Sequence, residues 1–391
     1  MIDEYGILDS AALVQARLFN ALKSPVRPWA VERTIADRGV IINGPRGIGK
    51  TSFLLRSAER SGARYLSMDH PALSVQSLYV WVERLFQRGV TVVYLDEIHA
   101  ARDWSRDLKA LYDAWPACTI WASGSSSLLL SQGIADLSRR FVSISMPPLS
   151  FREYLVLRGR GDFGLQDPLH HDVTIVATIL RTCPVLSLFE EYLEYGFKPL
   201  FTEGTESYPQ KLLQVVQKTM EADIPFLVPN ITQNHFRLMN AVLGYLSQSN
   251  IPVIQVNSLC REWNLGKEKL YSLLHAMEQT GLLRIIRYAT NHSAMSVGAK
   301  IFFADPSLYP ALSGKEGNMR EAFVAAALEY AGHSVHASRD ETAADFIVDN
   351  DITVEVGGLH KKRKSARHVV RDGADFSAVG MIPMWLLGFG W

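Results

Sequence analysis

A glycine-rich stretch that ends in lysine, threonine and serine, residues 44–52, has the composition of a loop that binds phosphate. Glycines allow consecutive backbone N–H groups to turn toward one phosphate, and the N-terminus of a following helix adds a positive partial charge. The lysine can reach the outer phosphates, and Thr51 can supply a hydroxyl to Mg²⁺. The predicted nucleotide-binding residues are Gly44, Pro45, Arg46, Gly47, Ile48, Gly49, Lys50, Thr51 and Ser52.

Two adjacent carboxylates, Asp96 and Glu97, directly follow the apolar stretch at residues 91–95. In open parallel sheets, ligands bind beyond the carboxyl ends of the strands, so an acid at such an end can face the phosphates. We predict that Asp96 organises Mg²⁺, directly or through water, and that Glu97 polarises the water that attacks the γ-phosphate. The alternative is that the two acids begin a solvated loop.

Several serines and an arginine further along the chain could complete such a site. A hydroxyl that follows the next apolar stretch could bind the γ-phosphate or the water; Ser125 is the preferred candidate, and Ser123 and Ser126 stay open. A serine-rich helix cap is the alternative. A cation near the γ-phosphate accelerates its transfer, and Arg140, with Arg139 beside it, is the candidate. A surface ion pair is the other interpretation of Arg140.

Short β-branched stretches alternate with amphipathic ones between residues 36 and 158, which predicts an open, doubly wound α/β domain with a parallel sheet. The predicted strands cover residues 39–43, 64–68, 91–95, 118–122 and 140–145. The predicted helices begin at residue 50 and lie near 74–88 and 104–115. This order puts the glycine-rich loop between a strand and a helix, as phosphate binding requires.

Four segments carry a resemblance to a known family: GPRGIGKT, VVYLDEIH, ASGSSSLLL and RRFVSISMPPLSFREYL. Together they resemble the large prokaryotic family of AAA-superfamily ATPases with GPRxxGKT, LDEIH and GSSS motifs, which are similar to archaeal ATPases and often carry a C-terminal nuclease-like domain. The resemblance covers about residues 20–158, and elsewhere only the layout agrees. It implies a P-loop NTPase fold of the additional-strand, catalytic-glutamate type, with ATP and Mg²⁺ bound. By this resemblance Asp96, Glu97, Ser125 and Arg140 occupy motif positions.

Two aromatic residues near the motifs have a structural and a functional interpretation. His99 in the LDEIH motif could shuttle a proton, although a hydrogen-bonded structural histidine is the preferred interpretation. Trp29, after Pro28, could pack on adenine, but core packing is preferred.

The rest of the chain is predicted to form further domains. A helical lead-in covers residues 1–35, the P-loop domain 36–158, a helical connector or lid 159–230, a winged helix 231–305, and a small α/β nuclease-like domain 306–391. In the winged helix, Lys267, Lys269, Arg284 and Arg287 could contact DNA. Nearby glutamates leave little net positive charge, so a structural or protein-contact role is preferred.

The tail contains three acids in the order found in restriction-endonuclease-like domains: Glu321, Asp345 and Glu355. Such acids collect a divalent metal, and the last motif of the PD-(D/E)xK nucleases also carries a lysine. Here Gly357 occupies that place, which predicts a degenerate nuclease domain without activity. Lysines 361, 362 and 364 lie downstream and could in principle substitute for it. They belong to a basic run at residues 360–371 that could contact DNA, although a flexible, solvated loop is the preferred explanation.

Composition limits the remaining possibilities. Lys+Arg and Asp+Glu both number 40, so a chain that binds nucleic acid over its whole surface is excluded. The three cysteines, Cys118, Cys183 and Cys260, form no C-x-x-C pair, which fits a reducing compartment. We find no secretory signal and no apolar stretch of about 18 residues, and therefore expect a cytoplasmic protein without a membrane partner.

The sequence as a whole predicts an ATP- and Mg²⁺-dependent ATPase whose hydrolysis drives domain rearrangement. One alternative is a nucleotide-gated switch or scaffold with slow hydrolysis. Another is an ATP-regulated DNA-binding protein with a degenerate nuclease domain. A homo-oligomer or a protein partner is also possible, since a neighbouring subunit can supply the arginine.

Overall fold

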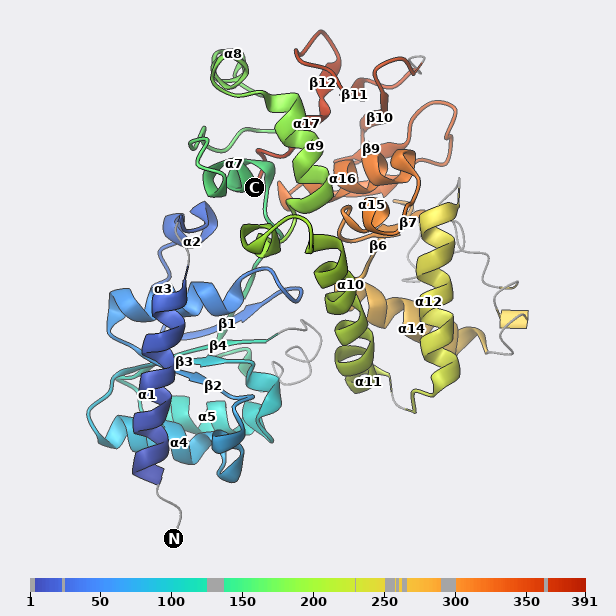
Figure 1. The fold of residues 1–391 in the computed structure, drawn as a ribbon. Coiled ribbons are helices and arrows are strands. Elements are labelled where there is room, and N and C mark those ends of the chain that lie inside the picture. The colour runs from blue at the N-terminus through green and yellow to red at the C-terminus, as the bar shows by residue number, and fades with distance from the viewer. Residues whose placement is uncertain are drawn as a thin grey trace. The chain divides into compact units, whose positions relative to one another are not determined.

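The computed structural model describes residues 4–22, 25–124, 137–228, 230–249, 257, 260–261, 266–289, 300–361 and 365–391. The chain divides into two compact units, Met1–Pro147 and Pro148–Trp391. Figure 1 traces the elements of both units along the chain.

The first unit is built on a five-stranded parallel sheet with the order β2-β3-β4-β1-β5 (Figure 1). Strand β4 therefore lies between β1, which precedes the glycine-rich loop, and β3, which ends at Asp96. All five predicted strands are confirmed within one or two residues. They are β1 Gly39–Asn43, β2 Arg64–Ser67, β3 Val92–Asp96, β4 Thr119–Ser123 and β5 Val142–Ser145.

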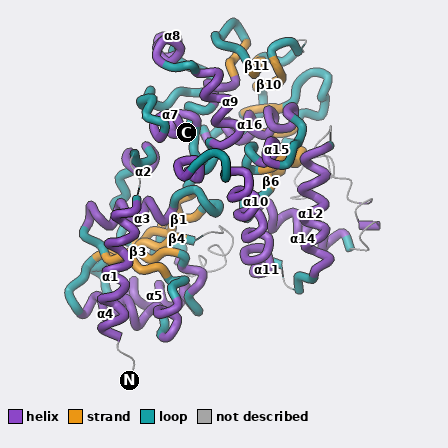
Figure 2. The backbone as a smooth tube through the Cα atoms, in the orientation of Figure 1, coloured by secondary structure: helices purple, strands orange, loops and turns teal. Residues whose placement is uncertain are grey.

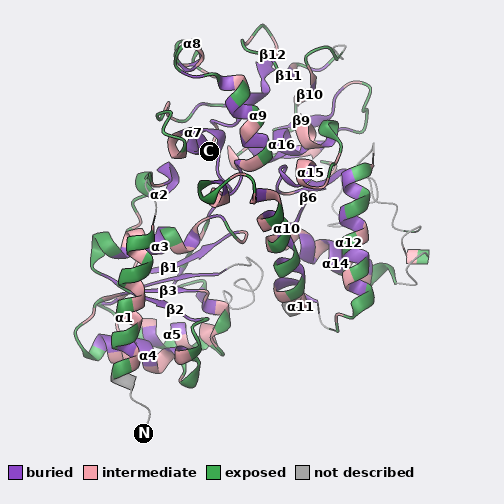
Figure 3. Ribbon diagram, in the orientation of Figure 1, coloured by how far each residue is buried: buried purple, intermediate pink, exposed green. Residues whose placement is uncertain are grey.

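Helices cover both faces of this sheet, and Figure 2 shows them around the strands. The predicted helices are confirmed as α3 Lys50–Ser61, α4 Leu78–Gln87 and α5 Trp104–Ala114, with short 3₁₀ turns η1 Pro71–Val75 and η2 Ile98–Ala100. Phe53 of α3 stacks on Trp121 of β4 on one face, whereas residues of α4 and α5 pack with Leu95 and Ile120 on the other. The central strands are buried because helices cover both faces of the sheet (Figure 3).

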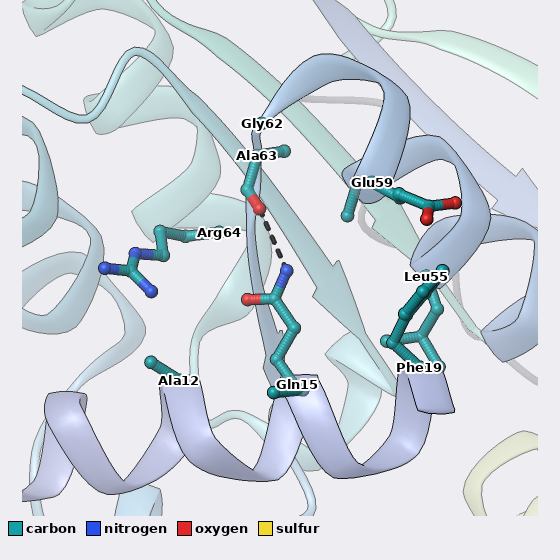
Figure 4. Close-up of a pocket in the computed structure, with 10 residues that line it drawn as sticks. Ala12, Gln15, Phe19, Leu55, Glu59, Gly62, Ala63 and Arg64 are labelled. Carbon is teal, nitrogen blue, oxygen red and sulfur yellow. Dashed lines mark hydrogen bonds between the residues drawn. The ribbon is translucent and has the colours of Figure 1, made fainter. Parts of the chain in front are cut away.

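A long N-terminal helix, α1 Glu4–Ala21, runs beside the edge strand β2 and is followed by the short α2 Pro28–Glu32. The Gln15 amide of α1 donates to the carbonyl of Ala63 and accepts from the N–H of Tyr65. These two bonds satisfy outward-facing backbone groups of an edge strand, which would otherwise be open to another chain. An open groove of about 380 Å³ lies between α1 and α3 (Figure 4).

The second unit begins with α7 Phe151–Leu157, which the sequence predicts as the end of the P-loop domain. The helices of the predicted connector follow: α8 Val173–Thr182, α9 Val185–Tyr195, η3 Pro199–Glu203, α10 Tyr208–Lys218, the π-helical turn η4 Thr219–Asp223, and α11 Ile224–Leu227. A capping box of Ser150 and Glu153 starts α7. Within the described residues, no single helix has the length and apolar character to cross a membrane; α8 and α9 together do, but they are bent by 87°.

Two helices and a β ribbon follow: α12 Gln233–Gln248, α14 Lys267–Gln279, and the antiparallel strands β6 Leu283–Ile286 and β7 Lys300–Phe303. The sequence also predicts a short helix at residues 256–264, between α12 and α14, and most of these residues lie outside the described ones. The described elements follow the predicted order of a helix, a second helix that ends near Gly281, and a β ribbon.

The chain ends in a mixed sheet with the order β12-β11-β10-β9-β8. Its elements are α15 Leu308–Ala311, α16 Glu316–Tyr330, β8 Val335–Ala337, β9 Phe346–Val348, β10 Ile352–Gly358, β11 His368–Asp372, β12 Met381–Pro383 and α17 Met384–Leu387. One expectation is wrong here: residues 368–371 form β11 rather than a solvated loop, since Val369 and Val370 are buried. The apolar stretch at residues 382–388, which the sequence predicts as a strand, is a strand only up to Pro383 and continues as α17.

The second unit has one continuous hydrophobic core, which contains residues from α7, α12, β7, α16 and α17. The segments predicted as connector, winged helix and nuclease-like domain thus share a core. The boundary between the two units falls after Pro147, so α7 belongs with the second unit.

Candidate functional site

The loop between β1 and α3 has the backbone that its glycines predict. Gly44, Gly47 and Gly49 have φ values of 144°, 77° and 99°, in the region that side chains disfavour. Gly44 is also tightly enclosed, because a Cβ there would lie 2.5 Å from the carbonyl oxygen of Met146. We call residues 44–51 the phosphate loop. Its last two residues, Lys50 and Thr51, are the first two residues of α3.

The Lys50 ammonium lies within this loop. Its Nζ donates to the carbonyl oxygens of Gly44, at 2.7 Å, and Pro45, at 2.9 Å, and the side chain is almost completely buried. Phosphate oxygens are stronger acceptors for an ammonium than carbonyls, because the bond is then charged at both ends. The lysine is therefore already placed where a phosphate chain would replace the carbonyls.

Asp96 ends β3 and is held by three hydrogen bonds. Its Oδ1 accepts from the hydroxyl of Ser123 and from the N–H of Glu97, the latter at 3.1 Å. Its Oδ2 accepts from the hydroxyl of Tyr65 at 2.8 Å. The carboxylate is only 2% exposed, and these three hydrogen bonds fix its orientation.

Glu97 has a φ of 49°, so the backbone turns sharply at the end of β3. Burial, followed by the charge of Asp96, raises the pKa of the Glu97 carboxyl, while Lys50 and Arg46 act in the opposite direction. The two cations of the phosphate loop therefore lie within electrostatic reach of this carboxylate. His99 Nε2 is 3.4 Å from Glu97 Oε2, so His99 contacts the carboxylate predicted to act on water.

Of the three candidate serines, the structure places Ser123 in contact with Asp96. Ser123 was the open neighbour of the preferred Ser125. Ser125 and Ser126 lie outside the described residues.

Arg140 is not brought to the phosphate loop of its own chain. It lies beside the start of β1, because a Cβ on Gly39 would be 2.5 Å from the carbonyl oxygen of Arg140. The phosphate loop begins at the other end of β1, about 13 Å away at roughly 3.3 Å per residue. The guanidinium pairs with both oxygens of Asp113, at 2.7 and 2.8 Å. The backbone of Arg140 therefore lies at the end of β1 opposite the phosphate loop.

Two residues before β1 support the loop. The buried Arg27 donates to the carbonyl of Ile48 at 2.7 Å and to that of Pro147 at 3.1 Å. Arg27 was not predicted from the sequence, where its only signal is its place beside Pro28. Trp29 packs edge-on against Phe53, with ring centroids 5.4 Å apart, which confirms core packing.

The oxygen atoms of Asp96 and Thr51 fit a Mg²⁺ ion that is held together with a nucleotide. A carboxylate offers about four lone-pair positions, and the three hydrogen bonds to Asp96 leave about one for a metal-bound water. No group of three or more acidic, histidine or cysteine side chains within the described residues could hold a metal by itself. Mg²⁺ characteristically takes one or two protein ligands and completes its shell with phosphates and waters.

The acids of the tail lie among cations. Lys300 of β7 donates to Glu321 of α16 at 2.8 Å and lies 3.9 Å from Asp345. Burial alone would lower the pKa of Lys300, but the carboxylates of Glu321 and Asp345 outweigh burial and raise it. The ammonium is thus charged and occupies the space between two of the three predicted metal ligands.

The third acid, Glu355, is fully buried, and Arg371 Nη2 lies 3.7 Å from its Oε1. Lys361 lies over Gly357, donates to the carbonyl of Val356 at 2.6 Å and is 3.8 Å from Asp345. Lysines 362 and 364 lie outside the described residues. The predicted metal ligands are therefore paired with lysine and arginine.

The arginines of the β6 segment are also paired. Arg284 forms an ion pair with Glu329, and Arg287 binds both oxygens of Glu278, at 2.9 and 2.8 Å. Their charges are neutralised within the unit, which favours a structural role over DNA contact.

Part of the chain is similar to known proteins. Residues 36–155 match the family model described as an AAA domain. The uncharacterized protein MJ1637 of Methanocaldococcus jannaschii is 25% identical over 378 residues, which cover 85% of this chain and 77% of that protein. ATPase family gene 2 protein homolog B of Mus musculus is 29% identical over 105 residues, which cover 24% of this chain and 14% of that protein.

Among solved structures, the Walker-type ATPase PABY2304 of Pyrococcus abyssi has a TM-score of 0.42 and 14% identity, covering 75% of this chain and 99% of that one. The matched AAA domain and the parallel sheet with its phosphate loop support assignment of residues 36–155 to a P-loop, AAA-like ATPase domain.

Proposed function

We propose that this chain hydrolyses ATP with Mg²⁺ and that hydrolysis drives rearrangement of the second unit. The observation that supports this best is that Lys50, Asp96 and Glu97 all lie at or after the carboxyl ends of strands of the parallel sheet. Lys50 acts electrostatically on Glu97, and Glu97 directly follows the clamped Asp96. A phosphate-binding cation and a candidate base are thus close together.

Each residue of the site has a proposed role. The backbone N–H groups of residues 44–51 and Lys50 bind the phosphates, and Lys50 exchanges its carbonyl partners for phosphate oxygens. Thr51 and Asp96 hold Mg²⁺, which neutralises charge on the phosphates. Glu97 orients the attacking water and accepts its proton. Ser123, through Asp96, and Ser125, as the predicted sensor, support this arrangement.

Arg140 is proposed to act on the nucleotide of a neighbouring copy. Its backbone lies beside the start of β1, at the end of that strand opposite the phosphate loop, which supports a contact with the phosphates of another subunit. Its partner Asp113 is half-exposed, so the ion pair can open at low cost.

The test is ATP binding and turnover by the full chain and two variants. Lys50→Ala should weaken nucleotide binding, measured by calorimetry. Glu97→Gln should bind ATP as the wild type does and turn it over at least about 100-fold more slowly, since general base catalysis contributes about 10²–10⁴-fold. Equal turnover by wild type and Glu97→Gln would remove the glutamate from the mechanism, and no heat from ATP·Mg would overturn the proposal.

The alternative function, a nucleotide-gated switch, predicts a lower rate of ATP turnover than this proposal does. Turnover that rises with protein concentration supports the ATPase with an arginine in trans. A rate that stays negligible at every protein concentration, with normal ATP binding, favours the switch.

Plasmid DNA is expected to stay intact with Mg²⁺ or Mn²⁺ and ATP, because Lys300 and Arg371 neutralise the tail acids.

A further inference from the structure

The hydroxyl of Tyr65 is the sole described side-chain donor to Oδ2 of Asp96, at 2.8 Å. Tyr65 belongs to β2 and Ser123, which serves Oδ1, belongs to β4. These two strands flank β3 on its two sides. The Asp96 carboxylate is therefore clamped from both neighbouring strands, one oxygen by each.

We propose that Tyr65 is a positioning residue for Asp96: its hydroxyl fixes the rotation of the carboxylate at which Asp96 meets the hydration shell of Mg²⁺. This inference rests on the proposed function. Without the hydroxyl, Oδ2 would lose its partner inside a buried site, and the carboxylate could turn about its terminal torsion, which is broad for aspartate. Partners that orient a metal ligand commonly change metal affinity or activity 10–100-fold when removed.

The direction of this bond follows from its chemistry. An ionised carboxylate only accepts hydrogen bonds, so Tyr65 must donate.

The backbone of Tyr65 is fixed from outside the sheet. The N–H of Tyr65 donates to Gln15 Oε1 at 3.1 Å, and Gln15 Nε2 donates to Ala63 at 3.0 Å, the bond drawn in Figure 4. An edge strand has a neighbour on one side only, so it is the strand of a sheet most easily displaced. Helix α1 supplies the missing side, so that Tyr65 can hold Asp96.

The test compares Tyr65→Phe with Tyr94→Phe in the full chain. Tyr94 is the register partner of Tyr65 on β3 and is equally buried, but its hydroxyl accepts from Ser61 at 3.3 Å rather than contacting Asp96. Turnover is measured against Mg²⁺ concentration, and binding of Mn²⁺ to the protein with a non-hydrolysable ATP analogue is measured by electron paramagnetic resonance. Tyr65→Phe should raise the half-saturating concentration of both metals about tenfold or more. Tyr94→Phe should leave both values at the wild-type level.

Nucleotide affinity in EDTA should be the same for both variants, since Tyr65 acts through the metal. Identical metal dependence of the two variants would overturn the inference, and the proposed function would stand. A wild type without Mg²⁺-dependent binding would overturn the proposed function itself. Gln15→Ala is the second variant and should shift the Mg²⁺ dependence in the same direction. If Tyr65→Phe does not fold, wild-type Mg²⁺ dependence of Gln15→Ala overturns the inference.

Discussion

The side chain of Lys361 lies directly over Gly357, and a Cβ at position 357 would overlap its Cδ. Gly357 stands where a nuclease of the predicted kind would carry a lysine. Lys361 therefore enters from the following turn the space that a side chain on the strand would take. Its ammonium donates to Val356 and approaches Asp345.

Gly357→Ala is expected to destabilise the protein by about 1 kcal/mol, because the new methyl group displaces Lys361. Urea denaturation of the full chain measures this change. Gly358→Ala is the matched control, since a Cβ there meets the nearest atoms, those of Arg320, at an ordinary 3.6 Å. The cost should vanish in a Lys361→Ala background, as a double-mutant cycle would show. Equal costs with and without Lys361 would contradict the overlap.

Lys300→Met is expected to destabilise the protein by about 3 kcal/mol, because it leaves Glu321 and Asp345 without their buried cation. The double variant Lys300→Met/Glu321→Gln should recover part of this loss, since one uncompensated charge is then removed. Urea denaturation of the single and double variants measures both effects. A single variant as stable as the wild type would show that the acids do not depend on Lys300.

Sequence patterns predicted the elements and acids of the first unit because their signals are local. A glycine-rich loop between a strand and a helix, and two acids after an apolar strand, are complete within a few residues each. Arg140 shows the limit of such signals. A residue that precedes a strand in the sequence lies near the amino end of that strand, whereas the phosphate loop lies at the carboxyl end of β1. Tyr65 reads as a core residue in sequence, and only the pairing of β2 with β3 brings it to Asp96. Likewise β11 was hidden in a basic run, since Arg371 is buried beside Glu355 rather than solvated.

Turnover should fall at low pH with a midpoint above 4.5, the ordinary glutamate value, because burial and Asp96 raise the pKa of Glu97. Only the ionised carboxylate accepts a proton, so activity is lost as pH falls through the raised pKa. Arg46→Ala should move the midpoint to higher pH, since Arg46 lowers the pKa of Glu97. Arg56→Ala is the control, because Arg56 pairs with Glu59 on α3. A kcat profile that is flat from pH 4 to 7, or a midpoint unmoved in Arg46→Ala, would contradict this electrostatic account.

Mixing two inactive variants tests whether Arg140 acts on a neighbouring copy. Arg140→Ala keeps its own Lys50, Asp96 and Glu97, whereas Glu97→Gln keeps its arginine. If Arg140 acts in trans, each variant alone should be slow, and an equimolar mixture should regain turnover, because some interfaces then combine an intact glutamate with an intact arginine. Asp113→Ala separates loss of the ion pair from loss of the guanidinium, and it should keep turnover and leave stability nearly unchanged, because exposed ion pairs contribute little. Wild-type turnover of Arg140→Ala at every protein concentration would show that Arg140 does not act on the nucleotide of another copy.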